Sequence, residues 1–272
     1  MARLWTRAIG ALEYARMFSD AKSVREFRRL FNAPRGGISQ VEVSKFRLRA
    51  LDGNYVYCRT AGTDINVFSD TFRGRYHVPP RDLRHIRKIL DLGSNIGLTM
   101  AHFACLFREA RILGIELDAQ NVEICRRNIA PYSGRCQVIW GAAWNEPGEL
   151  TYGGEEEWGF RVTPGQPSNR VVRAYTMRAL IDQLGAPVDF VKMDVEGAER
   201  ELLKEPESWI GDIRCMKVEV HEPYTVKQCI DDFQKHRWRT VIDDHHPACV
   251  LARNPNLNSV LAKGYEHHRV VT

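Results

Sequence analysis

The chain has 272 residues, of which 44% are hydrophobic, so it is long enough to bury the core of one large domain. Its net charge is +5, but residues 1–35 alone hold eight Lys/Arg against three Asp/Glu, so 31 of each sign remain in the rest. A catalytic domain that binds nucleic acid usually carries a basic surface. This balance therefore argues against a nucleic-acid partner.

The seven cysteines are scattered, odd in number and without a C-x-x-C spacing, so they indicate neither a zinc site nor a disulfide framework. The first residues lack the uninterrupted apolar run of a signal peptide, and no apolar span of about 18 residues occurs. We therefore expect a reduced, cytoplasmic protein without a transmembrane segment.

The first part of the chain is an extension that precedes the main domain. Residues 1–32 have a helical apolar pattern with arginines beside it, which favours a cap on the protein's own domain over a homodimer contact or an anionic membrane surface. Residues 41–57 alternate as a β-hairpin that turns at 52–54. The segment that begins at Thr63 is rich in turns and aromatics, and in it Asp64, Tyr76 and His77 lie either over a cofactor cleft or on a surface.

Two prolines, Pro79 and Pro80, mark the boundary of this extension. The sequence thus predicts an N-terminal helical and β-hairpin extension over residues 1–80 and a main domain over residues 81–272.

The main domain opens on a strand–loop–helix–strand unit. Residues 89–92 form a short apolar strand, a loop with Gly93 and Gly97 follows, and residues 98–107 have the composition of a buried helix. A second strand, residues 112–116, ends on Glu116, 19 residues after Gly97. This is a βαβ unit that suits a nucleoside.

The loop has features that favour S-adenosylmethionine (SAM) over a dinucleotide. Gly93 permits a sharp turn and Gly97 permits a close approach of helix and strand, whereas the dinucleotide fingerprint needs three glycines in G-x-G-x-x-G. An acid at the end of the second strand can accept hydrogen bonds from ribose hydroxyls. The expected cofactor residues here are Asp91, Gly93, Ser94, Asn95, Gly97, Glu116 and Leu117.

The remaining elements complete an α/β domain. Strands are expected at 137–143, 188–195, 213–220, 238–242, 248–251 and 259–261, with helices at 178–184, 200–203 and 226–236. Ala142 and Ala143 end the first of these strands and leave room for adenine, and residues 151–170 form a candidate substrate-facing loop. The pattern predicts a doubly wound, mostly parallel sheet with an antiparallel terminal strand, as in class I SAM-methyltransferases.

Chemistry is expected at the carboxyl ends of the strands, where ligands bind in open α/β sheets. Asp194, Glu219 and His221 fall there beside the cofactor residues, and Asp194 is also expected to contact the cofactor. Methyl transfer to a hydroxyl needs alignment and removal of a proton. Either His221 or Asp194 is the base, or Asp194, Glu219 and His221 bind Mg²⁺, or Glu219 and His221 are solvated residues without a role.

Several of these stretches resemble the FkbM-type family of SAM-dependent methyltransferases. The matching pieces are ILDLGSNIGLTMAHFA, GIELDAQNVEICRRNI, VIWGAAWNEPGEL, and above all DFVKMDVEGAERELL followed by KVEVHE. The upstream TDINVF is also similar to an element of that family. The resemblance covers roughly residues 60–222 and implies a class I methyltransferase fold with O-methylation of a small-molecule or glycoside acceptor, such as a polyketide-like secondary metabolite or a sugar.

The sequence therefore predicts a SAM-dependent O-methyltransferase. Three alternatives are weaker. A nucleic-acid base methyltransferase is expected to carry an N-P-P-Y-like tetrad where this chain has DVEG, and an oxidoreductase is expected to have a third glycine in the loop. A non-catalytic SAM-fold subunit would have no reason to retain Gly93, Glu116 and Asp194 together.

Overall fold

The computed structural model describes residues 16–31, 42–60, 62–153, 161–162, 170–244 and 246–257. Within these ranges the central sheet is built from β3 (Lys88–Leu92), β4 (Arg111–Glu116), β5 (Cys136–Trp140), β10 (Phe190–Met193), β11 (Cys215–Glu219), β12 (Arg239–Ile242) and β13 (Cys249–Arg253). The spatial order is β12-β13-β11-β10-β3-β4-β5. Strands β3, β4, β5, β10 and β11 are parallel, and β13 is antiparallel to both of its neighbours.

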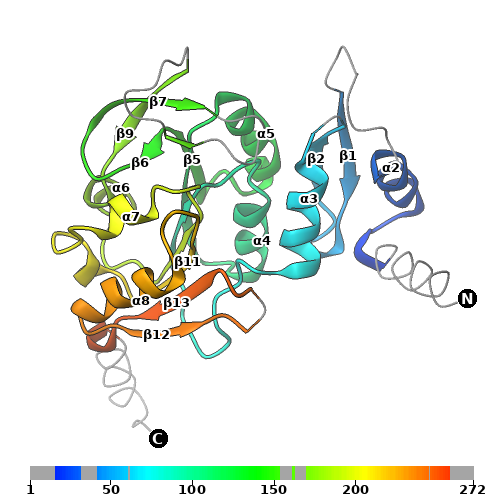
Figure 1. Ribbon diagram of the computed structural model, residues 1–272. Helices are drawn as coiled ribbons and strands as arrows, with labels where there is room; N and C mark the ends of the chain where they lie inside the picture. Colours follow the sequence, from blue (N-terminus) through cyan, green and yellow to red (C-terminus); the bar gives the residue numbers. More distant parts are fainter. Residues whose placement is uncertain are drawn as a thin grey trace, which may run out of the picture.

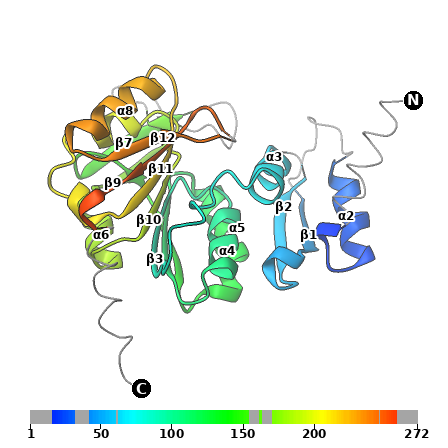
Figure 2. The same ribbon diagram turned by 90° about the horizontal axis from the view of Figure 1, so that it is seen from below.

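Helices cover both faces of this sheet (Figures 1 and 2). On one face lie α4 (Leu98–Leu106) and α5 (Ala119–Ile129), and on the other α6 (Met177–Leu184), α7 (Glu199–Leu203) and α8 (Val226–Lys235). All four residues of β10 are buried, as expected for a strand with helices on both sides. The doubly wound α/β class I methyltransferase fold, with its late antiparallel strand, is thus confirmed.

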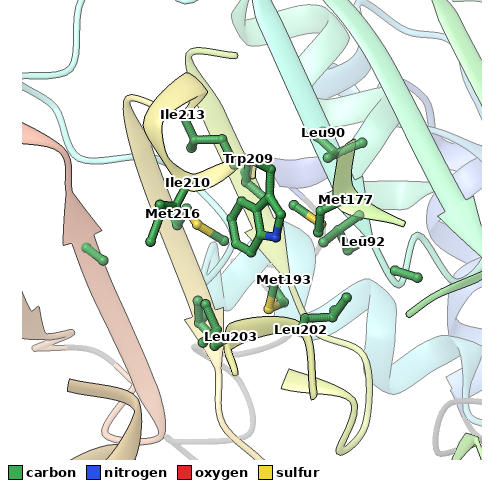
Figure 3. Close-up of a cluster of buried hydrophobic side chains, with 14 of the residues drawn as sticks. Leu90, Leu92, Met177, Met193, Leu202, Leu203, Trp209, Ile210, Ile213 and Met216 are labelled. Atoms are coloured by element: carbon green, nitrogen blue, oxygen red, sulfur yellow. The ribbon is translucent and has the colours of Figure 1, made fainter. Parts of the chain in front are cut away.

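The larger hydrophobic core lies on the α6–α7–α8 face. Figure 3 shows the indole of Trp209 surrounded by side chains that include Met177, Met193 and Met216. Trp209 is only 5% exposed. Flexible thioethers adapt to the irregular space around such a large ring.

The N-terminal extension contains α2 (Ala21–Phe31), the hairpin of β1 (Val43–Arg47) and β2 (Tyr55–Arg59), and α3 (Asp64–Ser69). Four buried rings, Phe18, Phe27, Phe46 and Phe68, join these pieces with centroid distances of 4.9–6.1 Å. The same cluster continues into α4 and α5. The extension therefore packs beside these two helices (Figure 1).

Two segments differ from the sequence predictions. Residues 64–69 are helical instead of turn-rich, because Ile65 and Phe68 bury one helical face against the hairpin. The strand expected over 137–143 is divided: β5 ends at Trp140, and β6 (Ala142–Ala143) joins a second sheet with β7 (Gly148–Gly153), β8 (Arg161–Val162) and β9 (Val171–Tyr175).

This second sheet replaces part of the loop expected over 151–170. Its break from β5 lies at Gly141, where a Cβ would be 2.6 Å from the ring of Tyr175. Residues 154–160 and 163–169, the strand expected at 259–261, and the helix expected before residue 16 lie outside the described residues. Among the described helices, none combines the length and apolarity that crossing a membrane requires.

Two buried histidines lie between the extension and α4. The Nε2 atom of His77 is 3.0 Å from Nδ1 of His102, and the side chains are 0% and 4% exposed. Because one nitrogen must donate and the other accept, the contact requires at least one neutral ring. Burial lowers the pKa of His77 well below its usual value, and burial followed by the charge of Arg75 lowers that of His102 to about 4.

We expect this pair to make the fold acid-sensitive. The unfolded chain takes up protons as pH falls below 6.5, whereas folded His102 resists protonation until about pH 4. The free energy of unfolding is therefore largest above the pKa of histidine in the unfolded chain. It decreases on acidification, by on the order of 3 kcal/mol for His102. Urea unfolding at about pH 7 and pH 4.5 should show a smaller acid loss for His102→Gln than for the exposed-histidine control His85→Gln. Equal losses would contradict this assignment.

Candidate active site

A cavity of about 390 Å³ opens at the carboxyl ends of the parallel strands. Of the twelve site residues expected from the sequence, nine line it: Gly93, Ser94, Asn95, Glu116, Leu117, Ala142, Ala143, Asp194 and Glu219. The other three support its wall. Asp91 is buried beneath the loop, Gly97 packs against α5, and His221 lies behind Asp194.

The shape of the cavity depends on the two glycines of the loop after β3. Gly93 has φ +76°, and a Cβ there would lie 1.7 Å from the carbonyl oxygen of Asp194. The loops that follow β3 and β10 therefore approach more closely than any side chain would allow. At Gly97, with φ +78°, a Cβ would lie 2.6 Å from Sγ of Cys125, so the close approach is to helix α5 and not to a strand as expected.

Glu116 is held by donors that close the loop around it. Its Oε2 accepts from the Asn95 amide at 2.8 Å, and its Oε1 accepts from the Asp118 amide at 2.9 Å and from Nδ2 of Asn121 at 3.3 Å. Burial raises the pKa of Glu116, while the amides of Asp118 and Asn95 oppose that shift. A carboxylate offers about four acceptor positions, so the one-bonded Oε2 retains capacity for a hydroxyl.

A buried lysine ties the floor of the cavity together. Nζ of Lys192 donates to the carbonyl of Gly93 at 2.9 Å and lies 3.2 Å from Oδ2 of Asp194 and 3.5 Å from Oδ1 of Asp91. Burial disfavours the ammonium, but the surrounding acids, Asp194 foremost, raise the pKa of Lys192 well above its usual value. The charged lysine therefore compensates both carboxylates, and Tyr76 adds a hydrogen bond to Oδ2 of Asp194 at 3.3 Å.

The pKa values of Glu219 and His221 are both raised above their usual range. Burial and then the charge of Asp194 raise the pKa of Glu219 to about 8. For His221, burial is outweighed by the hydrogen bond from Nδ1 to Glu199, at 2.9 Å, and by the charges of Asp194 and Glu196, which raise its pKa to about 9. At neutral pH, His221 is thus a cation and Glu219 is largely protonated.

The residues expected to bind Mg²⁺ are the same ones whose protonation is shifted. Asp194, Glu219 and His221 offer ligand atoms within 4.8 Å of one another. However, metal ligands must be deprotonated, and Mg²⁺ prefers oxygen donors in octahedral geometry. A protonated imidazole and the ammonium of Lys192 already neutralise Asp194, so these residues fit a resident magnesium ion poorly.

The cavity wall also contains residues that sequence reasoning missed. Among them are Asp70, Asn121, Lys192 and His246. Only Lys192 carried a signal, since a lysine inside a fully buried strand must have acidic partners. Of the three extension residues considered, Tyr76 lines the cavity, His77 is buried against His102, and Asp64 is buried in an ion pair with Arg59.

Comparisons with known proteins agree with this geometry. The model of the methyltransferase FkbM domain matches residues 91–246, more than half of the chain. No curated protein matches the chain in sequence.

Solved structures resemble the chain only distantly. Precorrin-6y C5,15-methyltransferase from Geobacter metallireducens shows 12% identity and a TM-score of 0.37, with 59% of this chain and 69% of that chain covered. Monomeric WbdD shows 16% identity and a TM-score of 0.42, with 72% of this chain and 43% of that chain covered. The fibrillarin pre-rRNA processing protein of Methanococcus jannaschii shows 12% identity and a TM-score of 0.43, with 81% of this chain and 84% of that chain covered. At these values the likenesses support no conclusion about an acceptor.

The close contact at Gly93 makes this position intolerant of any side chain. We expect Gly93→Ala to push the loops after β3 and β10 apart, since its Cβ would meet backbone 1.7 Å away. Both the melting temperature and the affinity for S-adenosylhomocysteine should fall. Gly134→Ala is the matched control, because a Cβ there meets nothing within 4 Å. Unchanged binding by a folded Gly93→Ala variant would show that this contact does not shape the site.

Proposed function

The chain belongs to the methyltransferase FkbM family, and on that premise we propose that it transfers a methyl group from SAM to a hydroxyl of a sugar or secondary-metabolite acceptor. One observation carries the proposal: a single cavity joins the glycine loop, Glu116 and the carboxylates Asp194 and Glu219. The cavity therefore has a donor half, around the glycine loop and Glu116, and an acceptor half, around Asp194 and Glu219, which contains a base.

The donor half offers what a nucleoside with an amino-acid tail requires. Glu116 has acceptor capacity for the ribose, and the small residues Gly141, Ala142 and Ala143 leave room for a flat base. The volume of about 390 Å³ lies in the range of small-molecule sites. When bound, SAM supplies a methyl group on a sulfonium that departs as a neutral thioether.

The acceptor half contains a base suited to a hydroxyl. A sulfonium leaving group needs no acid, so the protein must align the acceptor oxygen and accept its proton. Glu219 serves this role best, because its pKa of about 8 lies close to neutral pH. His221, held as a cation by Glu199, Asp194 and Glu196, is better placed to orient Asp194 than to remove a proton.

The many carboxyl oxygens of the acceptor half favour a neutral polyol. Asp70, Asp194, Glu196 and Glu219 all line the cavity. Carboxyl oxygens accept hydrogen bonds from hydroxyl groups, which agrees with a sugar or polyketide acceptor.

The cofactor assignment has a direct test. We expect S-adenosylhomocysteine, and not NAD, to raise the melting temperature. Glu116→Ala should weaken its binding by on the order of 1.5–3 kcal/mol, as for a lost hydrogen bond to a charged group. Glu123→Ala, which removes an exposed acid on α5, the helix that follows Glu116, is the control. Preferential stabilisation by NAD would reverse the assignment.

The base assignment predicts a pH profile. With an acceptor identified in a screen of glycosides and polyketides, kcat/KM measured in EDTA should rise with pH and level off above about 8, as Glu219 loses its proton. Glu219→Gln should slow turnover by about 10²–10⁴-fold, whereas the exposed control Glu205→Gln should not. Full activity of Glu219→Gln, or loss of wild-type activity in EDTA, would contradict the mechanism.

A further inference from the structure

A buried hydrogen-bond chain connects the N-terminal extension to the cavity. Nη2 of Arg59, at the end of β2, donates to Oδ1 of Asn121 on α5 at 2.7 Å. Asn121 lines the cavity, and its Nδ2 donates to Oε1 of Glu116 at 3.3 Å. Arg59 and Asn121 are only 4% and 1% exposed, so water does not compete for these bonds.

Arg59 is itself held rigidly. Asp64, in the first turn of α3, accepts from Nε of Arg59 at 3.1 Å, from Nη2 at 2.7 Å and from the Arg59 backbone amide at 2.7 Å. Asp64 is 1% exposed. A fork of this kind fixes the plane of a guanidinium, and the Arg59–Asp64 pair therefore presents one donor to Asn121 in a defined direction.

This donor decides which way the Asn121 amide faces. An asparagine has an accepting oxygen and a donating NH₂ group. With its oxygen bound to Arg59, the NH₂ group faces Glu116. The reversed amide would place two donors against the guanidinium and a carbonyl oxygen against the Glu116 carboxylate, which is repulsive at both ends.

We propose that Arg59, locked by Asp64, is a positioning residue for the methyl donor: through Asn121 it orients Glu116 toward the ribose. The inference rests on the proposed SAM-dependent function and assigns the extension a part in cofactor binding. It requires no contact between Arg59 and the ligand. Because the ribose is remote from the transferred methyl group, the relay should change the affinity for SAM more than the rate of transfer.

The test is a double-mutant cycle on S-adenosylhomocysteine binding, measured by calorimetry. Removing both members of a buried ion pair avoids an unpaired charge, so the first variant is Arg59→Met/Asp64→Leu. We expect it to weaken binding about tenfold. Asn121→Ser keeps the Arg59–Asp64 ion pair and should cause the same loss of affinity for S-adenosylhomocysteine. It tests the relay independently if the first variant does not fold.

The cycle is closed by Glu116→Gln. In that background, removal of Arg59 and Asp64 should cost less than about twofold, because the relay acts only through Glu116. Arg127→Gln, which removes an exposed arginine paired with Glu123 on α5, is the control and should leave affinity unchanged. In a methyl-transfer assay, the KM for SAM should rise about tenfold while kcat at saturating SAM stays within about twofold.

The outcomes separate the two levels of the proposal. Undiminished affinity of the variants, or losses that add to that of Glu116→Gln, would overturn the relay and leave the methyltransferase assignment intact. A fall in kcat without a rise in KM would also overturn it. Failure of the wild-type protein to bind S-adenosylhomocysteine would overturn the proposed function and the relay with it.

Discussion

The site depends on the near-contact between the loops that follow β3 and β10. Gly93 lies so close to the carbonyl of Asp194 that a Cβ would be 1.7 Å from it. Lys192 joins the same two points from below, with 2.9 Å to the carbonyl of Gly93 and 3.2 Å to Asp194. Because neighbouring parallel strands end together, this contact brings the nucleoside side and the carboxylate side into one cavity.

The second constraint is charge. Asp91, Asp194, Glu196, Glu199 and Glu219 lie close to one another around the ends of β3, β10 and β11. Two cations embedded among them, Lys192 and His221, offset part of this charge without occupying the open space. Burial, and then the remaining negative charge of Asp194, raise the pKa of Glu219. The same crowding that would destabilise an ordinary carboxylate thus supplies a base that works near neutral pH.

Much of this arrangement was predictable from local sequence. The apolar run of β3, the spacing from Gly97 to Glu116, the DVEG turn and the ends of the strands expected at 137–143 and 213–220 each carry a short-range signal. Together they located nine residues of the cavity wall. The division of the strand expected at 137–143 was not predictable, because it depends on the ring of Tyr175 against Gly141, far along the chain. Asp70, Asn121 and His246 reach the cavity from separate segments, and the Arg59–Asn121 bond spans 62 residues. The protonation states of Glu219 and His221 follow from packing, which no sequence spacing encodes.

The central claim is that a SAM-type nucleoside occupies the cavity between Gly93, Glu116 and Asp194. A crystal structure with S-adenosylhomocysteine tests it most directly. The account predicts ribose hydroxyls at Oε2 of Glu116, the base along Gly141–Ala143, and the homocysteine tail beside Gly93 and Asp194. Ligand bound at another place on the chain, or an empty cavity at saturating ligand, would contradict it.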